Sequence, residues 1–153
     1  MPEAADPAGR RSRHPRRPRR EARRLALDIL YQADVTGSRP SRVLADREGA
    51  GPHVAPFAGE LVLGVEEHQP ELDRLIAAHL RGWTLERLAV VDRNVLRVAT
   101  FELLHRPDVP PAAAIAEAVE MVKELSTEDS GRFVNGILGG IARDVAEPHG
   151  GSA

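Results

Sequence analysis

The segment that decides the fold is AVVDRNVLRVATFELLH, residues 89–105. Drawn as a helix at about 100° per residue, its apolar side chains point in every direction around the axis. A helix that is apolar on all sides is a central one, covered by its neighbours. Arg97 and Glu102 lie within it, and each must be paired or reach solvent because a lone buried charge is costly. We therefore expect the rest of the chain to pack around this segment.

Helical periodicity continues on both sides of residues 89–105. No stretch alternates apolar and polar residues as a strand would, and no internal repeat is present. The sequence therefore predicts an all-α helical bundle of about six to seven helices. Before the central helix we expect helices at about 19–35, at 54–68 and from Pro70 to the break at Gly82, with at most a short helix at 41–47 within the loop 37–53. After it we expect helices at 111–125 and from a Ser126 or Thr127 cap to about Val145.

The composition narrows the chemistry. The 153 residues contain no cysteine, which excludes disulfides, thiolate zinc sites, iron–sulfur clusters and a cysteine nucleophile. No apolar run is long enough to span a bilayer, and the N-terminus has no apolar signal core. We therefore expect a cytoplasmic protein.

The net charge of −2 conceals a strong asymmetry along the chain. Residues 1–24 hold nine arginines against three acidic residues, a net charge of +6, so the remainder carries −8. A basic arm on an acidic body is typical of proteins that bind nucleic acid or an anionic membrane, although a solvated tail without a ligand has the same composition. Residues 1–18 are too polar and proline-rich to order themselves, so we expect a disordered arm there and a flexible tail at 147–153.

No pattern of catalytic residues is present. The chain has no phosphate-binding GxxxxGK[ST] or GxGxxG loop, no HExxH and no GxSxG. Its six histidines are scattered without metal-ligand spacing, and His68, His79 and His105 each fall at the end of a predicted helix, where a capping role is expected. The sequence therefore predicts a protein that is not an enzyme and has no cofactor and no metal.

Two features point instead to RNA. The first is a row of arginines at the start of the first helix, where Arg16, Arg20, Arg23 and Arg24 fall on the side opposite the apolar face. The second is the start of the last helix, where Phe133 follows Arg132. RNA recognition needs cations for phosphates and an aromatic face for an unstacked base. Periodicity alone places Phe133 in the core, and both roles are compatible if it lies at the rim of the core.

Four motifs, in order, resemble the family of the transcription antitermination factor NusB. The likeness covers about residues 19–145, within a single predicted domain at 19–146. The motifs are RREAR at 19–23 with LYQ at 30–32, VDRNVLR at 91–97 with FEL at 101–103, VP at 109–110 with IAEAVE at 115–120, and DSGRFVNGIL at 129–138.

The resemblance implies two three-helix bundles that share a long helix. It also implies a stand-alone, non-catalytic factor that binds single-stranded boxA-type leader RNA with NusE, a small-subunit ribosomal protein. That complex would act with other Nus factors on RNA polymerase, above all in ribosomal RNA operons. The RNA-contacting residues implied by the resemblance or by the arginines at the start of the first helix are Arg16, Arg19, Arg20, Arg23, Arg24, Asp129, Arg132 and Phe133.

One position departs from the family, and several alternatives stay open. Ala116 stands where the family usually has asparagine. The sequence does not choose between a monomer and a homodimer. A helical protein-binding adaptor with an idle basic arm, or a helical DNA-binding regulator, is also compatible with the pattern, although neither of the helices that would follow a helix-turn-helix break is basic.

Overall fold

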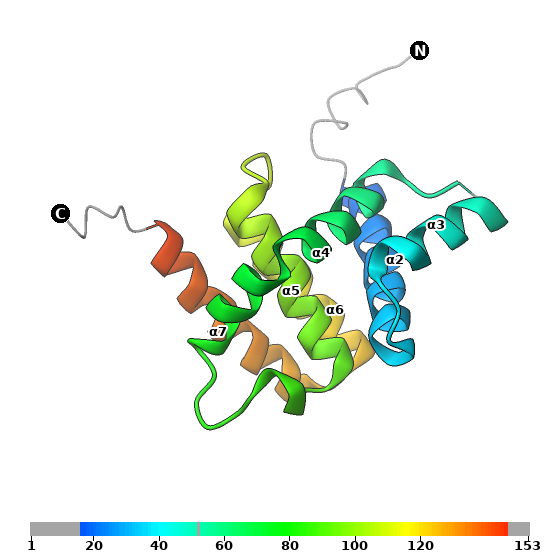
Figure 1. Cartoon of the computed structure of the whole chain (residues 1–153). Helices are drawn as coiled ribbons and strands as arrows, with labels where there is room; N and C mark the ends of the chain where they lie inside the picture. The colour runs from blue at the N-terminus through cyan, green and yellow to red at the C-terminus, as the bar shows by residue number, and fades with distance from the viewer. Residues whose placement is uncertain (1–15, 52, 147–153) are drawn as a thin grey trace, which may run out of the picture.

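The computed structural model describes residues 16–51 and 53–146, with side chains from residue 18 onward. It confirms the all-α class: the described residues form six α-helices and one 3₁₀ turn, with no strand among them (Figure 1). None of these helices is long and apolar enough to cross a membrane. The elements are α2 (Arg16–Thr36), α3 (Pro40–Ala50), α4 (Pro56–Ala77), η1 (Leu85–Arg87), α5 (Val90–His105), α6 (Pro111–Leu125) and α7 (Glu128–Ala146).

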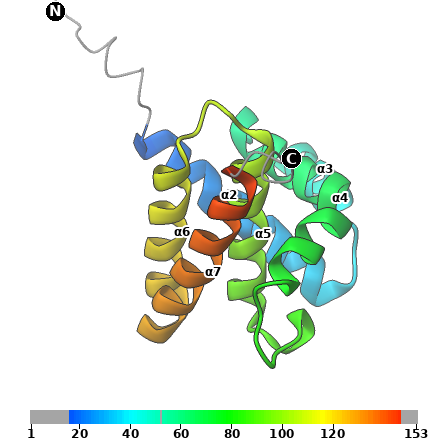
Figure 2. The same cartoon turned by 90° about the vertical axis from the view of Figure 1, so that its left-hand side faces the viewer.

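The helices form two groups on either side of α5. In Figure 2, α6 and α7 lie side by side on one flank, α3 and α4 lie on the other, and α5 runs between them. One apolar core is built mainly from α2, α3 and α4 and includes Val98 and Phe101 of α5. The second is built mainly from α5, α6 and α7 and includes Leu27 of α2. The central segment thus contributes to both cores, as its all-round apolar pattern predicts.

Both charged residues inside α5 are paired, as expected. Arg97 donates two hydrogen bonds to Asp73 of α4, at 2.8 and 3.0 Å. Glu102 accepts two from Arg23 of α2, at 2.9 and 2.7 Å. These pairs fix α5 to both neighbouring helices of the first core.

Local sequence signals explain most of the helix starts. Proline occupies the first turn of α3, α4 and α6, where its missing N–H costs no hydrogen bond. The start of α7 has the expected cap, because the Ser130 N–H donates to the Thr127 hydroxyl at 3.0 Å.

Three boundaries differ from the prediction. α4 continues through Pro70 as one helix, where two were expected; Pro70 lies on the exposed side, so the carbonyl that loses its N–H partner can be hydrated. α3 is a full helix of 11 residues rather than a short piece of a loop. α2 begins at Arg16, three residues early, because Pro18 is tolerated anywhere in a first turn. The predicted arm before residue 16 and the tail at 147–153 lie outside the described residues.

α4 and α5 approach each other closely at Gly64. A side-chain carbon added there would lie 2.2 Å from the ring of Phe101, so only glycine leaves room for that ring. Phe101 is buried in the first core at this contact.

Candidate nucleic-acid interface

The outward arginines of α2 reach across to α6. Arg20 donates two hydrogen bonds to Glu117, at 3.0 and 3.1 Å. Arg24, one turn further along α2, is paired with Glu124, two turns further along α6. The Arg20 side chain remains 52% exposed. Its hydrogen bonds to Glu117 raise the pKa of Arg20, so the guanidinium is charged at any physiological pH. Arg20 and Arg24 therefore form a fixed pair of cations at the surface, which we call the arginine row.

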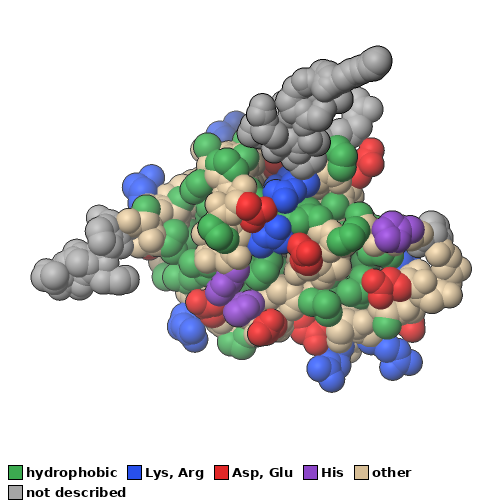
Figure 3. Space-filling model, turned by 90° about the horizontal axis from the view of Figure 1, so that it is seen from above, with side chains coloured by type: hydrophobic (Ala, Val, Ile, Leu, Met, Phe, Trp, Pro, Cys, Tyr) green, Lys and Arg blue, Asp and Glu red, His purple; other side chains and the backbone are tan. Residues whose placement is uncertain are grey.

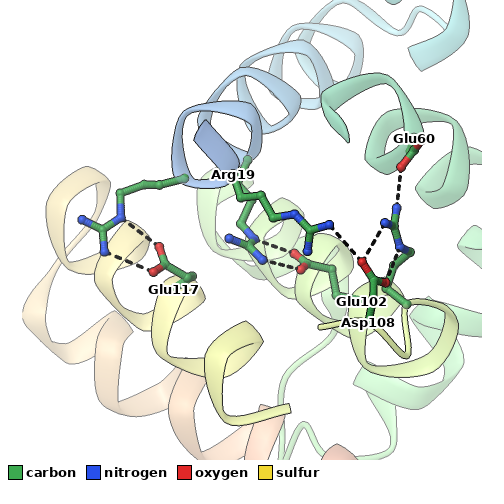
Figure 4. A network of polar contacts seen from close by, with 8 residues as sticks. Arg19, Glu60, Glu102, Asp108 and Glu117 are labelled. Atoms are coloured by element: carbon green, nitrogen blue, oxygen red, sulfur yellow. Dashed lines mark hydrogen bonds and ion pairs between the residues drawn. The ribbon is translucent and has the colours of Figure 1, made fainter. Parts of the chain in front are cut away.

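Arg19 belongs to a network around the loop between α5 and α6 (Figure 4). It donates to Asp108 at 2.9 Å and lies over the Phe57 ring, 4.4 Å from the ring centre. Arg106 also donates to Asp108, at 2.9 and 3.0 Å, and contacts Glu60. The Arg106 hydrogen bonds, followed by that of Arg19, hold the pKa of Asp108 well below its usual range. The network fixes the first turns of α2 against α4 and the α5–α6 loop.

Arg23 does not join the arginine row, and its expected place on the outer side of the helix was wrong. Only 6% of its side chain and 1% of the Glu102 side chain are exposed, and the two form the bidentate pair described above (Figure 4). The helical period explains this position, because Arg23 lies one turn before Ala26 on the buried face of α2. Arg23 is therefore a buried structural residue.

The remaining predicted residues lie at the start of α7. Asp129 and Arg132 are exposed and form an ion pair with each other. Phe133 is half-buried: it packs against the second core and also lines a surface hollow of about 320 Å³. It therefore lies at the rim of the core, where a ring can both pack and meet a ligand. The hollow also includes Trp83 and Arg87 of the α4–α5 connection.

A groove connects the two predicted regions. It is lined by Arg24, Tyr31, Val91 and Leu125 among others, and lies between α2, the start of α5 and the end of α6. The hollow at Phe133 includes Asp92, the residue after Val91, and Thr127, which lies two residues beyond Leu125 in the α6–α7 link. The groove, which Arg24 lines, and the hollow therefore lie next to each other at the start of α5 and at the α6–α7 link. On the face seen from above (Figure 3), basic and acidic side chains are interspersed rather than gathered in patches of one charge.

The family model for the NusB family matches residues 20–143. The chain belongs to the NusB family. It is 49% identical over 139 residues to the transcription antitermination protein NusB of Symbiobacterium thermophilum, covering 83% of this chain and 90% of that protein. It is 50% identical over 127 residues to the protein of the same name from Saccharopolyspora erythraea, covering 81% and 86%.

Solved structures of NusB proteins have the same fold. A crystal form of T. maritima NusB matches with a TM-score of 0.74 at 39% identity, covering 82% of this chain and 90% of that one. A complex of antitermination factors NusB and NusE with double-stranded RNA contains a chain that matches with a TM-score of 0.73 at 31% identity, covering 84% and 98%.

Sequence reasoning missed several lining residues of this NusB-family surface. Trp83 is 55% exposed and lines the hollow. Tyr31 is 43% exposed in the groove. The signal that could have found them is rarity, because a chain with 3% aromatic residues places its only Trp and only Tyr at the surface.

Proposed function

We propose that this chain is a non-catalytic transcription antitermination factor that binds boxA-type leader RNA together with NusE. In this role it helps RNA polymerase, with other Nus factors, to read through terminators in ribosomal RNA operons. Its relatives are named transcription antitermination proteins, and a structural neighbour is a complex of NusB and NusE with double-stranded RNA. The observation that carries the proposal is the groove lined by Arg24 beside the hollow lined by Phe133 and Trp83, which places exposed cations and aromatic rings on neighbouring parts of the surface.

The arginine row supplies the phosphate contacts. Arg20 and Arg24 hold their guanidiniums in water, each against a carboxylate, and a phosphate offers the same bidentate acceptor geometry. Arg19 lies one residue before Arg20, and Arg16 lies one turn earlier on the same helix. Arg23 contributes by holding the helix in place and not by contacting RNA. If about four to six phosphates are bound, the log–log dependence of affinity on salt should have a slope of about −3 to −4.

The hollow supplies the base contact. Phe133 and Trp83 offer ring faces on which an unstacked base can lie, and Asp129 and Arg132 at its edge offer an acceptor and donors for a base edge or a phosphate. Stacking of this kind does not require a particular base, so sequence preference must come from the polar neighbours or from NusE.

The test is a fluorescence anisotropy titration of a labelled boxA RNA and a scrambled control, with and without NusE, across a salt series. We expect selective binding that NusE strengthens. Phe133→Ala should cost about 1–3 kcal/mol of binding free energy. Arg20→Ala with Arg24→Ala should weaken binding to both RNAs and flatten the salt dependence.

The matched control is Arg42→Ala with Arg74→Ala, which removes the same charge from exposed positions on α3 and α4. If the folded α2 double variant binds as tightly as this control, the arginine row is not the phosphate contact. If the wild-type chain binds no RNA even with NusE present, the chain is a protein-binding adaptor.

A further inference from the structure

Two histidines and a glutamate meet where the middle of α4 contacts the end of α5. His68 and Glu71 lie one turn apart on α4, and His105 is the last residue of α5. The imidazole rings of the two histidines stack with their centres 4.0 Å apart. The sequence position of His68 suggested a cap at a helix end, but α4 continues through Pro70, so His68 lies inside the helix.

Each ring places one nitrogen near the same carboxylate oxygen, and the His105 nitrogen is hydrogen-bonded to it. Glu71 Oε1 lies 3.1 Å from His105 Nε2 and 3.5 Å from His68 Nδ1. All three atoms lie within 4.8 Å of one another. In a tetrahedral zinc site with bonds of about 2.1 Å, neighbouring ligand atoms are about 3.4 Å apart. Two of the three distances between ligand atoms are therefore close to those of a tetrahedral site, and the rings, now 23° from parallel, need to turn so that both nitrogens point at one ion.

The packing around the cluster holds the rings in this arrangement. Phe101, seated against Gly64, contacts both imidazoles, with ring centres 5.9 Å from His68 and 5.4 Å from His105. The second nitrogen of His68 faces Glu67 Oε1 at 3.9 Å. This distance is beyond hydrogen-bond range, so Glu67 adds only its negative charge to the surroundings of the cluster.

We propose that His68, Glu71 and His105 bind a divalent transition metal ion of the zinc type. Two imidazole nitrogens and one carboxylate oxygen suit zinc and its neighbours, whereas calcium and magnesium prefer oxygen ligands alone. The three side chains are 30%, 42% and 32% exposed, so an ion can enter from solvent and a water can complete the coordination. The bound ion would link α4 to the end of α5. This site is independent of the RNA-binding proposal, because none of its ligands lines the groove or the hollow.

The experiment uses the untagged full chain after treatment with a chelator. Zinc is titrated by calorimetry at pH 7.5, where imidazole is ordinarily neutral and free to bind metal. Cobalt(II) is titrated in parallel, since its visible absorption reports the coordination geometry. We expect one site of micromolar dissociation constant and the intense visible bands of four-coordinate cobalt.

Variants separate this site from the other histidines. Glu71→Gln and His105→Gln should each weaken zinc binding by at least about tenfold, because even outer-shell partners contribute that much. His79→Gln is the matched control: His79 also faces one carboxylate, Asp144, at 2.8 Å, but has no second imidazole beside it. Circular dichroism checks that each variant is folded. If His105→Gln does not fold, Glu71→Gln still tests the proposal, because the Glu71 side chain is 42% exposed and its substitution leaves the core intact.

Three results would overturn the proposal. The first is that zinc does not bind at concentrations up to about 100 μM, roughly a hundred times the expected dissociation constant. The second is binding that Glu71→Gln and His105→Gln leave unchanged. The third is binding that His79→Gln abolishes. In each case the cluster is only a hydrogen-bonded pair of stacked rings.

Discussion

Arg20 and Arg23 lie three residues apart on α2, and each meets a carboxylate through two parallel hydrogen bonds of similar length. They differ in burial, because half of the Arg20 side chain is in water and almost none of the Arg23 side chain is. Water can replace Glu117 at Arg20, and so can a phosphate. Nothing can replace Glu102 at Arg23 unless the core opens. The same chemical pair is therefore open to a ligand at one position and closed within the core at the other.

The largest effect should follow from removing the charge at the buried pair. Glu102→Gln leaves the Arg23 guanidinium buried without a counter-charge, and we expect it to lower the free energy of unfolding by about 3–5 kcal/mol. Urea denaturation followed by circular dichroism measures this loss. As a control, Arg23→Met with Glu102→Leu replaces both charges by apolar groups and should cost much less. A loss below about 1 kcal/mol for Glu102→Gln would mean that burial does not separate the two pairs.

Asp108 lies between these extremes, because it accepts hydrogen bonds from Arg19 and Arg106 but is 46% exposed. We expect Asp108→Asn to cost at most about 1 kcal/mol, since water screens the attraction. The cost should also depend on pH. Because Arg106 and Arg19 lower the pKa of Asp108, the charged form stabilises the fold fully above the ordinary carboxyl pKa of about 4, and this stability is lost as the pH falls further.

Urea denaturation of the wild type and of Asp108→Asn at several pH values measures this dependence. The difference between the two proteins should stay constant from pH 7 to about pH 4 and narrow only below that. A difference that closes between pH 7 and pH 5 would assign the effect to another group.

The carboxylate that faces the arginine row should weaken RNA binding. Glu124 is exposed and paired with Arg24, so a phosphate must displace it or tolerate its charge. We expect Glu124→Gln to raise RNA affinity about twofold, the size of one screened surface interaction. Fluorescence anisotropy at low salt measures the change. Glu48→Gln removes the same charge from an exposed position on α3, and an equal gain from that control would attribute the effect to net charge.

The smallest effect should be that of removing an arginine of the row on the stability of the fold. Arg20→Ala removes a solvent-exposed ion pair, and we expect no measurable change in the free energy of unfolding, because water screens the attraction. Urea denaturation under the conditions used for Glu102→Gln gives the direct comparison. A loss close to that of Glu102→Gln would show that the exposed pair is also structural.

The sequence was sufficient for the fold wherever the apolar pattern was strong. The all-round pattern of residues 89–105 predicted a central helix, and the cap at Thr127 was confirmed. The pattern failed at Pro70, because a proline on the solvent side of a helix need not end it.

For the candidate site, the sequence indicated residue types but not their orientation. Helical spacing was expected to place Arg23 on the outer side with Arg20 and Arg24, whereas it lies on the buried face, and its partner Glu102 is 79 residues away in the sequence. The cluster of His68, Glu71 and His105 could not be predicted for the same reason. His105 is 34 residues beyond Glu71, and only the packing of α5 on α4 brings them together. Contacts between distant segments of this kind have no local sequence signal.

The place of α5 in both apolar cores has a consequence for how the molecule comes apart. Val98 and Phe101 belong to one core, while Leu96 and Ala99, on the same few turns, belong to the other. Neither three-helix group can release α5 without exposing the apolar surface of the other. The two groups should therefore melt in one cooperative transition, and the backbone amides of α5 should be the last to exchange with deuterated solvent.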